Sequence, residues 1–170
     1  MLNLMKKIIL ITTILTFFTS CSQTVKETFL IPSGFEGRIN VVFNQPNANP
    51  ITVENDRRIY KIPADGILIT SSKLETGILN QEYYYVDNNG NKEKIDVTEF
   101  NKELGVKPSV AKYGTVGVYG NSNEQNPLEF LESIIASKIT IDSIYEYKNE
   151  MDFQKKIMKK TNKSSKTGII

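Results

Sequence analysis

The chain has 170 residues, with 21 basic and 19 acidic side chains, one cysteine, and neither histidine nor tryptophan. This length predicts one main domain, and a lone cysteine excludes a disulfide within the chain. The lack of histidine removes the usual general base and metal ligand, and the lack of tryptophan removes the commonest platform on which sugars stack.

The first 20 residues have the organisation of an export signal. Lys6 and Lys7 precede the apolar run 8–18, which has the length of a signal-peptide core and is shorter than the roughly 20 residues that span a bilayer. We therefore predict that residues 1–20 are a signal peptide. Their removal leaves 19 basic and 19 acidic side chains, so the mature side chains carry no formal net charge.

The residues at the end of this signal, Phe18, Thr19 and Ser20 before Cys21, resemble the lipobox of bacterial lipoproteins. The resemblance implies that Cys21 carries fatty acyl groups such as palmitate and becomes the N-terminus. Two acyl chains anchor a protein stably where one does not, so the membrane is the first predicted partner. Ser22 in place of aspartate implies the outer membrane, if the organism has two membranes. An ordinary secretory signal with a leftover thiol is the alternative.

The remainder of the chain has short β-type runs at roughly ten-residue spacing, which is typical of a β-sandwich or barrel. We predict a lipidated tether over residues 21–27, a β-rich domain with a C-terminal helix over 28–160, and a flexible tail over 161–170. The expected fold is mainly β, a single sandwich of the transthyretin-like or immunoglobulin-like kind. The predicted strands, each bounded by turn residues, are 28–31, 38–43, 57–62, 67–70, 82–87, 92–97 and 114–119.

Two of these segments carry further detail. The alternation in 38–43 predicts a half-buried strand with Asn40 and Val42 on its second face. The stretch Asp-Asn-Asn-Gly-Asn at 87–91 predicts a hairpin turn, because asparagine and glycine accept positive φ. A calcium loop would need a glutamate well downstream, and Gly90 comes too early for it.

The C-terminal part contains one ambiguous segment, residues 128–141. Asn126 and Pro127 favour the start of a helix, whereas β-branched residues such as Ile134 and Ile135 favour a strand, so both assignments stay open. Asp142 is predicted to cap a helix over residues 143–160.

Two stretches carry a resemblance to a known family. The sequences IPSGFEGRINVVFNQP at 31–46 and RRIYKIPADGILIT at 57–70 resemble a family of bacterial lipoproteins and envelope proteins whose shared domain has no assigned function. The likeness covers residues 28–97 and extends more loosely toward Ile144. It implies a small exported β-rich domain and brings no catalytic residues. Residues 60–66 also resemble a strand and turn of transthyretin-like and carboxypeptidase-regulatory sandwiches, which concerns fold alone.

The candidate binding residues each have an ordinary structural alternative. Arg57 and Arg58 suit a charged recognition edge, although charges on a strand usually form an exposed face with cross-strand pairs. Tyr84, in a run of three tyrosines, suits an interface or core packing. Asn121 and Asn123 lie in a polar loop that suits a sugar or peptide, or is simply a solvated connector.

No stretch predicts an enzyme. The chain has no glycine-flanked serine elbow and no phosphate loop, so we predict no catalytic residue, metal site or cofactor. The C-terminal lysines are expected to form a solvated face or to contact anionic head groups, and nucleic acid is not an expected partner of an exported protein. The lysines of this cluster are Lys155, Lys156, Lys159, Lys160, Lys163 and Lys166.

The leading hypothesis is a non-enzymatic, membrane-anchored envelope lipoprotein that presents loops or a sheet edge to a protein or glycan. One alternative is an immunity-like inhibitor of a secreted toxin or hydrolase. Another is a carboxylate-dependent hydrolase that uses a pair such as Asp65 and Glu82.

Overall fold

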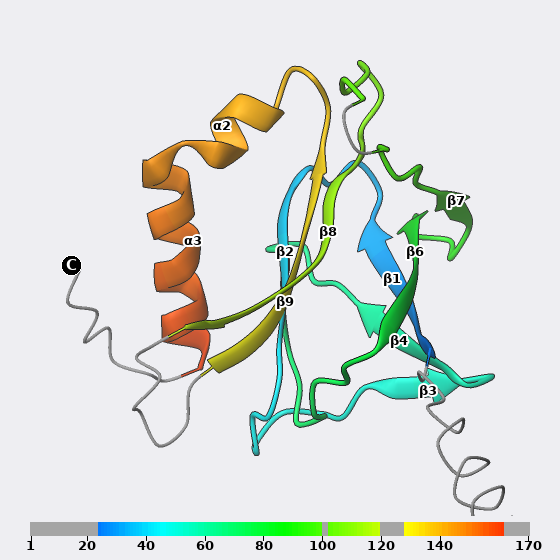
Figure 1. The fold of residues 1–170 in the computed structure, drawn as a ribbon, viewed down its shortest axis with the longest axis vertical. Coiled ribbons are helices and arrows are strands. Elements are labelled where there is room, and N and C mark those ends of the chain that lie inside the picture. Colours follow the sequence, from blue (N-terminus) through cyan, green and yellow to red (C-terminus); the bar gives the residue numbers. More distant parts are fainter. Residues whose placement is uncertain (1–23, 100–101, 120–127, 162–170) are drawn as a thin grey trace, which may run out of the picture.

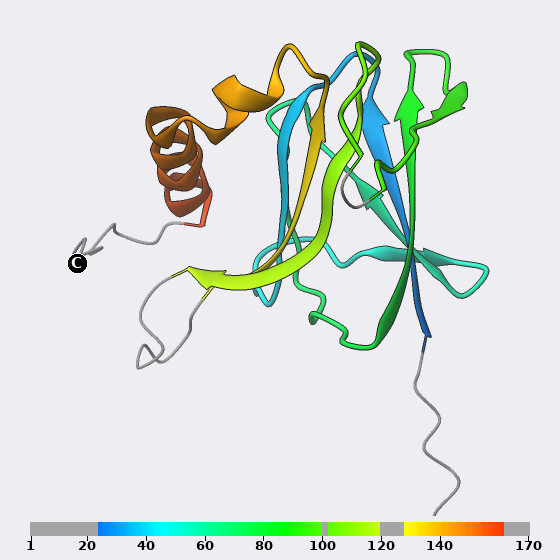
Figure 2. The same cartoon turned by 45° about the horizontal axis from the view of Figure 1, so that its top comes forward.

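The computed structural model describes residues 24–99, 102–119 and 128–161. They form two mixed β-sheets, and a C-terminal helical arm packs on the outer face of one sheet (Figures 1 and 2). The predicted mainly β sandwich with a C-terminal helix is therefore confirmed. In the part of the chain described, no helix has the length and apolar character needed to cross a membrane.

The first sheet, sheet A, is built around parallel strands. It consists of β1 (Thr24–Pro32), β3 (Thr52–Glu54), β4 (Arg57–Lys61), β6 (Ile78–Val86) and β7 (Lys92–Lys94). Their order is β3-β4-β1-β6-β7, with β1 parallel to both neighbours and the two edge strands antiparallel. This pairing differs from the antiparallel sheets of immunoglobulin domains.

The second sheet, sheet B, resolves the ambiguous segment. It consists of β2 (Gly37–Val42), β5 (Ile67–Ile69), β8 (Ser109–Tyr119) and β9 (Leu128–Ala136), in the order β5-β2-β9-β8. Residues 128–136 are therefore a strand. Every residue from Leu131 to Ala136 is buried, because β9 lies inside the sheet and both of its faces are covered. β-Branched side chains pack well in such a position.

The central strand of sheet A begins earlier than predicted. β1 starts at Thr24, so residues 24–27 of the predicted tether are part of the sheet. Val25 and Glu27 are buried in it. The polar composition of this stretch does not predict a strand. Glu27 can be buried there because it accepts hydrogen bonds from Tyr60 and Gln81, which are distant in the sequence.

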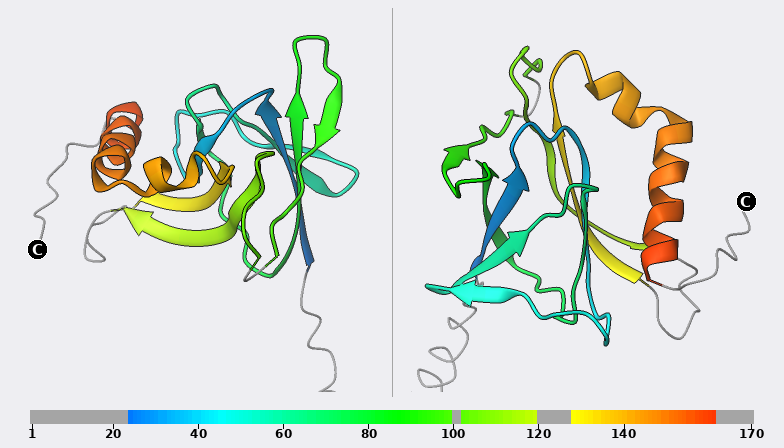
Figure 3. Two further views of the ribbon diagram at one scale, coloured as in Figure 1. Left: turned by 90° about the horizontal axis from the view of Figure 1, so that it is seen from above. Right: turned by 180° about the vertical axis from the view of Figure 1, so that it is seen from behind.

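Two hydrophobic cores hold the layers together. The larger core fills the space between the sheets, and the smaller one lies between sheet B and the helical arm (Figure 3). The smaller core is formed by Val42, Ile67, Leu128 and Ile157. Asn40 and Val42, expected on the open face of a half-buried strand, are fully buried. That expectation was wrong because the helical arm covers this face.

The helical arm has two parts, α2 (Ile141–Tyr145) and α3 (Tyr147–Lys160). The predicted helix over 143–160 is therefore present over 147–160, but it is not continuous from residue 143. Glu146 has an extended backbone (ψ 131°) and separates the two helices. Asp142 lies in the first turn of α2 rather than at its cap, which is Thr140.

Two predicted turns are confirmed. In the 87–91 hairpin, one carboxylate oxygen of Asp87 accepts the backbone N–H groups of Asn89 and Asn91, both at 2.9 Å. Gly66 ends the turn before β5 with φ +76°, and a Cβ there would collide with the carbonyl oxygen of Arg38. Glycine is required at that position.

Candidate functional site

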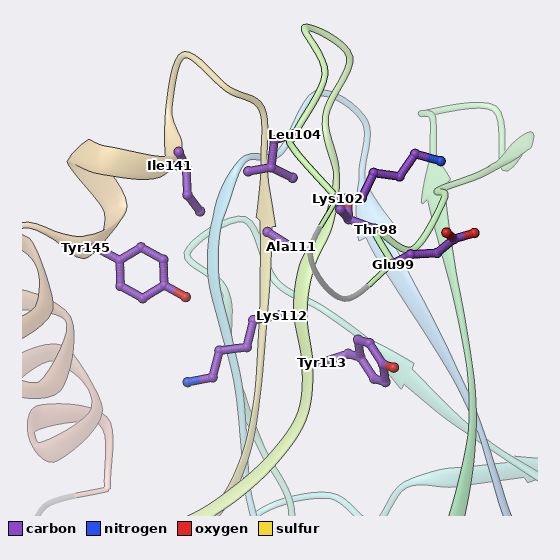
Figure 4. Close-up of a pocket in the computed structure, with 9 residues that line it drawn as sticks. All are labelled: Thr98, Glu99, Lys102, Leu104, Ala111, Lys112, Tyr113, Ile141 and Tyr145. Carbon is purple, nitrogen blue, oxygen red and sulfur yellow. The ribbon is translucent and has the colours of Figure 1, made fainter.

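A cleft of about 580 Å³ lies where β8, the helical arm and the segment before β8 meet. We call it the β8–α2 cleft. Its lining residues lie on both sides of β8, an edge strand, so the cleft runs around the edge of sheet B (Figure 4). These residues are Thr98, Glu99, Lys102, Leu104, Ala111, Lys112, Tyr113, Ile141 and Tyr145.

An irregularity in β8 shapes this cleft. The register with β9 shifts between Val110 and Lys112 and again between Lys112 and Thr115. Extra residues in one strand of a pair bend it and redirect its side chains. As a result Lys112 points toward the helical arm and Tyr113 points to the other side of β8 (Figure 4). The Tyr113 side chain is 57% exposed.

A charge cluster centred on the buried Glu132 lies next to the cleft and shares Lys112 with it. The Glu132 carboxylate accepts hydrogen bonds from Arg38 at 3.1 Å, Asn40 at 3.4 Å and Lys112 at 2.7 Å. The second terminal nitrogen of Arg38 lies 3.4 Å from a carboxylate oxygen of Glu150 on α3. The buried Arg38 and Glu132 are thus paired with each other and with the partly exposed Glu150 and Lys112. This pairing matters because an unpaired buried charge is strongly destabilising.

The same cluster positions the aromatic wall of the cleft. The Arg38 guanidinium lies 5.3 Å from the centre of the Tyr145 ring, a distance at which a cation is attracted to an aromatic face. The contact fixes α2 against sheet B while Tyr145 stays 48% exposed. Burial and the charge of Glu132 raise the pKa of the nearby Tyr119 hydroxyl, which donates to Asn40 at 3.2 Å.

The cleft lining carries groups that bind ligands. Both oxygens of Glu132 are engaged by donors, so this carboxylate is a poor general base. The exposed Tyr113 and Tyr145 rings and the amine of Lys102 offer stacking and charge to a ligand. Among the described residues, no group of three or more histidine, cysteine, aspartate or glutamate side chains is arranged to hold a metal ion.

The two candidate arginines lie on opposite faces of β4. Arg58 is 7% exposed; it donates to the Lys73 carbonyl at 2.9 Å and forms an ion pair with Glu75. Arg57 instead lies on the outer face of sheet A, 3.4 Å from a carboxylate oxygen of Glu82. The pair therefore does not form one recognition edge.

Tyr84 joins Arg57 on the outer face of sheet A. Its hydroxyl donates to Glu82 at 3.2 Å, so Glu82 links the two candidates. Tyr83 and Tyr85 are buried between the sheets, as expected for alternating side chains. Asn121, Asn123, the lipobox residues and Cys21 lie outside the described residues.

The candidate hydrolase pair does not share a site. Asp65 forms an ion pair with Lys160 of α3, on the side of sheet B that the helical arm covers. Glu82 contacts Arg57 and Tyr84 on the outer face of sheet A. The sandwich lies between them.

The cleft residues Lys112, Tyr113 and Tyr145 were not found by sequence reasoning. Tyr113 directly precedes the glycine at the start of the predicted strand 114–119, and a tyrosine beside a strand irregularity is a weak signal. Nothing local links it to Tyr145, because the two residues come to line one cleft only through the pairing of β8 with β9 and the return of the arm.

The fold and cleft define a small β-sandwich with a helical arm packed on one sheet. The chain belongs to DUF6843, a family of unknown function, whose model matches residues 23–167. This confirms the predicted uncharacterised, lipoprotein-like domain family.

A solved structure has the same fold. It is the 2.75 Å crystal structure of a Bacillus anthracis protein described as a "putative lipoprotein", with a TM-score of 0.58 and 22% sequence identity. The similarity covers 84% of this chain and 100% of that one. No curated protein matches the sequence.

Proposed function

We propose that this protein is a lipid-anchored, non-enzymatic module of the bacterial cell envelope that binds a protein or glycan ligand in the β8–α2 cleft. The observation that carries the proposal is the cleft itself, a ligand-sized space lined by the half-exposed Tyr113 and Tyr145 on the two sides of β8 and by lysine side chains. Tyrosines and a few placed polar groups are the usual lining of binding sites.

The anchor rests on separate support. Phe18-Thr19-Ser20-Cys21 follows an apolar signal core, and the Bacillus protein of the same fold is described as a "putative lipoprotein". Cys21 would carry palmitate or a similar acyl group, in the outer membrane if the organism has two. We expect Cys21→Ala to abolish incorporation of labelled palmitate, and unchanged labelling would contradict the anchor.

The binding role is tested by crosslinking in intact cells. Wild-type protein tagged after Ile170 should recover a stoichiometric protein or glycan, and Tyr145→Ala should reduce that recovery about tenfold if the ring is a binding hot spot. Tyr147→Ala is the matched control, because Tyr147 is 68% exposed and lies outside the cleft lining. Circular dichroism would verify that both variants fold.

Two results would contradict the proposal. Equal recovery by the Tyr145 and Tyr147 variants would remove the cleft as the binding site. Hydrolysis of an envelope polymer by purified residues 22–170 would overturn the non-enzymatic assignment.

A further inference from the structure

The distance along the chain between the lipidation site and the folded domain is very short. β1 begins at Thr24, three residues after Cys21, and three residues span at most about 11 Å. Val25 is buried directly after this point, and β1 is held between β4 and β6. The start of β1 therefore cannot move far from the acyl chains without breaking the sheet.

The parallel strands define which surface lies near that point. β1, β4 and β6 run in the same direction, so they begin at one end of sheet A, and Thr24 pairs with Ile78 in register. The β3–β4 hairpin lies at the same end (Figure 1). We call this end the anchor-side surface; its residues are Thr24, Lys26, Val53, Asp56 and Ile78.

The chemistry of the anchor-side surface suits a head-group layer. Ile78 is 59% exposed and Val53 is 62% exposed. Lys26 and Asp56 form an ion pair at 3.2 Å and so neutralise each other. Apolar side chains beside neutral polar ones are tolerated at the boundary between head groups and acyl chains.

The C-terminal end of α3 lies across the molecule from the start of β1, and the two lie at a similar height along its longest axis (Figure 1). Lys156 and Lys159 are exposed, and neither forms an ion pair with another described residue. Such side chains are attracted to anionic lipid head groups.

We infer that the short link from Cys21 holds the anchor-side surface against the phospholipid head groups and turns the β8–α2 cleft away from the bilayer. The inference rests on the proposed lipid anchor. Residues 102–109 and α2, which border the cleft, lie at the end of the molecule opposite the start of β1 (Figures 1 and 4). The cleft is then open to a ligand that approaches from beyond the membrane surface.

The test uses the full-length lipidated protein in vesicles of phosphatidylcholine and phosphatidylglycerol. Acylation consumes the native thiol, so a single new cysteine can carry a fluorophore. Ile78→Cys labels the anchor-side surface, and Ile139→Cys is the matched control, since Ile139 is a 77% exposed isoleucine in the turn before α2. Both sites are exposed, so neither substitution should disturb folding.

The readout is quenching by lipids that carry a nitroxide on the head group. We expect the fluorescence of the label at residue 78 to be quenched at least about twofold more than that of the label at residue 139. The reason is that contact quenching requires proximity to the head groups. Iodide, a quencher dissolved in the water, should quench the label at residue 139 more strongly than the label at residue 78.

The outcomes separate the orientation from the anchor. Flotation of the protein with vesicles, together with equal quenching at both sites or stronger quenching at residue 139, would overturn the orientation alone. Failure to float with vesicles would overturn the anchor and the orientation with it. In that case binding of a ligand in the cleft could still be measured on residues 22–170.

Discussion

At the residue scale, a chain of buried polar side chains joins the two sheets. The Glu27 carboxylate accepts from the Tyr60 hydroxyl and from the Gln81 amide, each at 2.6 Å. The Tyr83 hydroxyl lies 3.0 Å from Gln81 and 2.9 Å from Ser133 of sheet B. Buried polar groups that are fully bonded favour one packing arrangement over others.

The buried tyrosines make stability depend on alkaline pH. Burial raises the pKa of Tyr60 and of Tyr83, and it raises the pKa of Tyr85 from its ordinary value of 10.0 to about 12. Below pH 10 these phenols are neutral in both states, and their contribution is fully present. Between pH 10 and 12 only the unfolded phenols ionise, so we expect the free energy of unfolding to fall.

Urea unfolding at several pH values would measure this loss. Tyr85→Phe should lose less stability between pH 10 and 12 than the wild type, because the variant has no phenol at this position. Tyr147→Phe is the control for the substitution itself, since Tyr147 is 68% exposed. If the free energy of unfolding of the Tyr85 variant falls with pH as steeply as that of the wild type, the raised pKa of Tyr85 is contradicted.

Gly117 is a second residue with a specific packing role. It lies opposite Phe130 in the β8–β9 pair, and a Cβ there would overlap the Phe130 ring. That ring stacks on Tyr119 at a centroid distance of 4.1 Å. We expect Gly117→Ala to lower the free energy of unfolding by about 1–3 kcal/mol, because the stacked ring must move.

The matched control for this glycine is Gly105→Ala. An added Cβ at Gly105 would approach no atom closer than 3.9 Å, so the change should stay within about 0.5 kcal/mol. Chemical denaturation measures the stability of both variants. Similar unfolding midpoints would contradict the prediction, because they would mean that the Phe130 ring moves at little cost in free energy.

At the element scale, α3 is held by one fully buried side chain. Ile157 is the buried residue of the helix, and Phe153 and Met158 pack beside it over sheet B. We expect Ile157→Ala to lower the free energy of unfolding by about 2–5 kcal/mol, because it leaves a cavity in the smaller core.

The same substitution at an exposed site controls for the loss of the side chain itself. Ile139 is 77% exposed, so Ile139→Ala should change stability by less than about 0.5 kcal/mol. Thermal or urea unfolding serves for both variants. A loss at position 157 as small as that at position 139 would mean that α3 does not depend on this core.

At the scale of the whole molecule, sheet B belongs to both cores. On β2, Val41 faces the core between the sheets and Val42 faces the core under α3. Since one strand contributes to each, loss of either core should destabilise the other. We expect a single cooperative unfolding transition.

Two optical signals would test this coupling. The helix signal in the far ultraviolet reports α3, and the near-ultraviolet signal reports tyrosines such as Tyr60 and Tyr83 in the larger core. Both should change at the same urea concentration. Earlier loss of the helix signal would show that the arm unfolds independently.

The candidate site was largely beyond sequence reasoning. Arg58 reads as an exposed charge on a strand, yet it is buried because β4 turns the face that carries Arg58 and Tyr60 toward Phe43. Arg57 lies on the other face and is partly buried. The burial of a charge depends on partners such as Glu75, which sequence alone does not identify.

The sequence by itself determined the mainly β class, the positions of most strands, and the turns at Gly66 and at 87–91, because alternation and turn chemistry act between near neighbours. Only the tertiary structure decided that residues 24–27 join β1, that 128–136 is a strand, and that the helix breaks at Glu146. It also placed Lys112, Tyr113 and Tyr145 around one cleft. These features depend on contacts between segments far apart in the chain, whose energies no local pattern encodes.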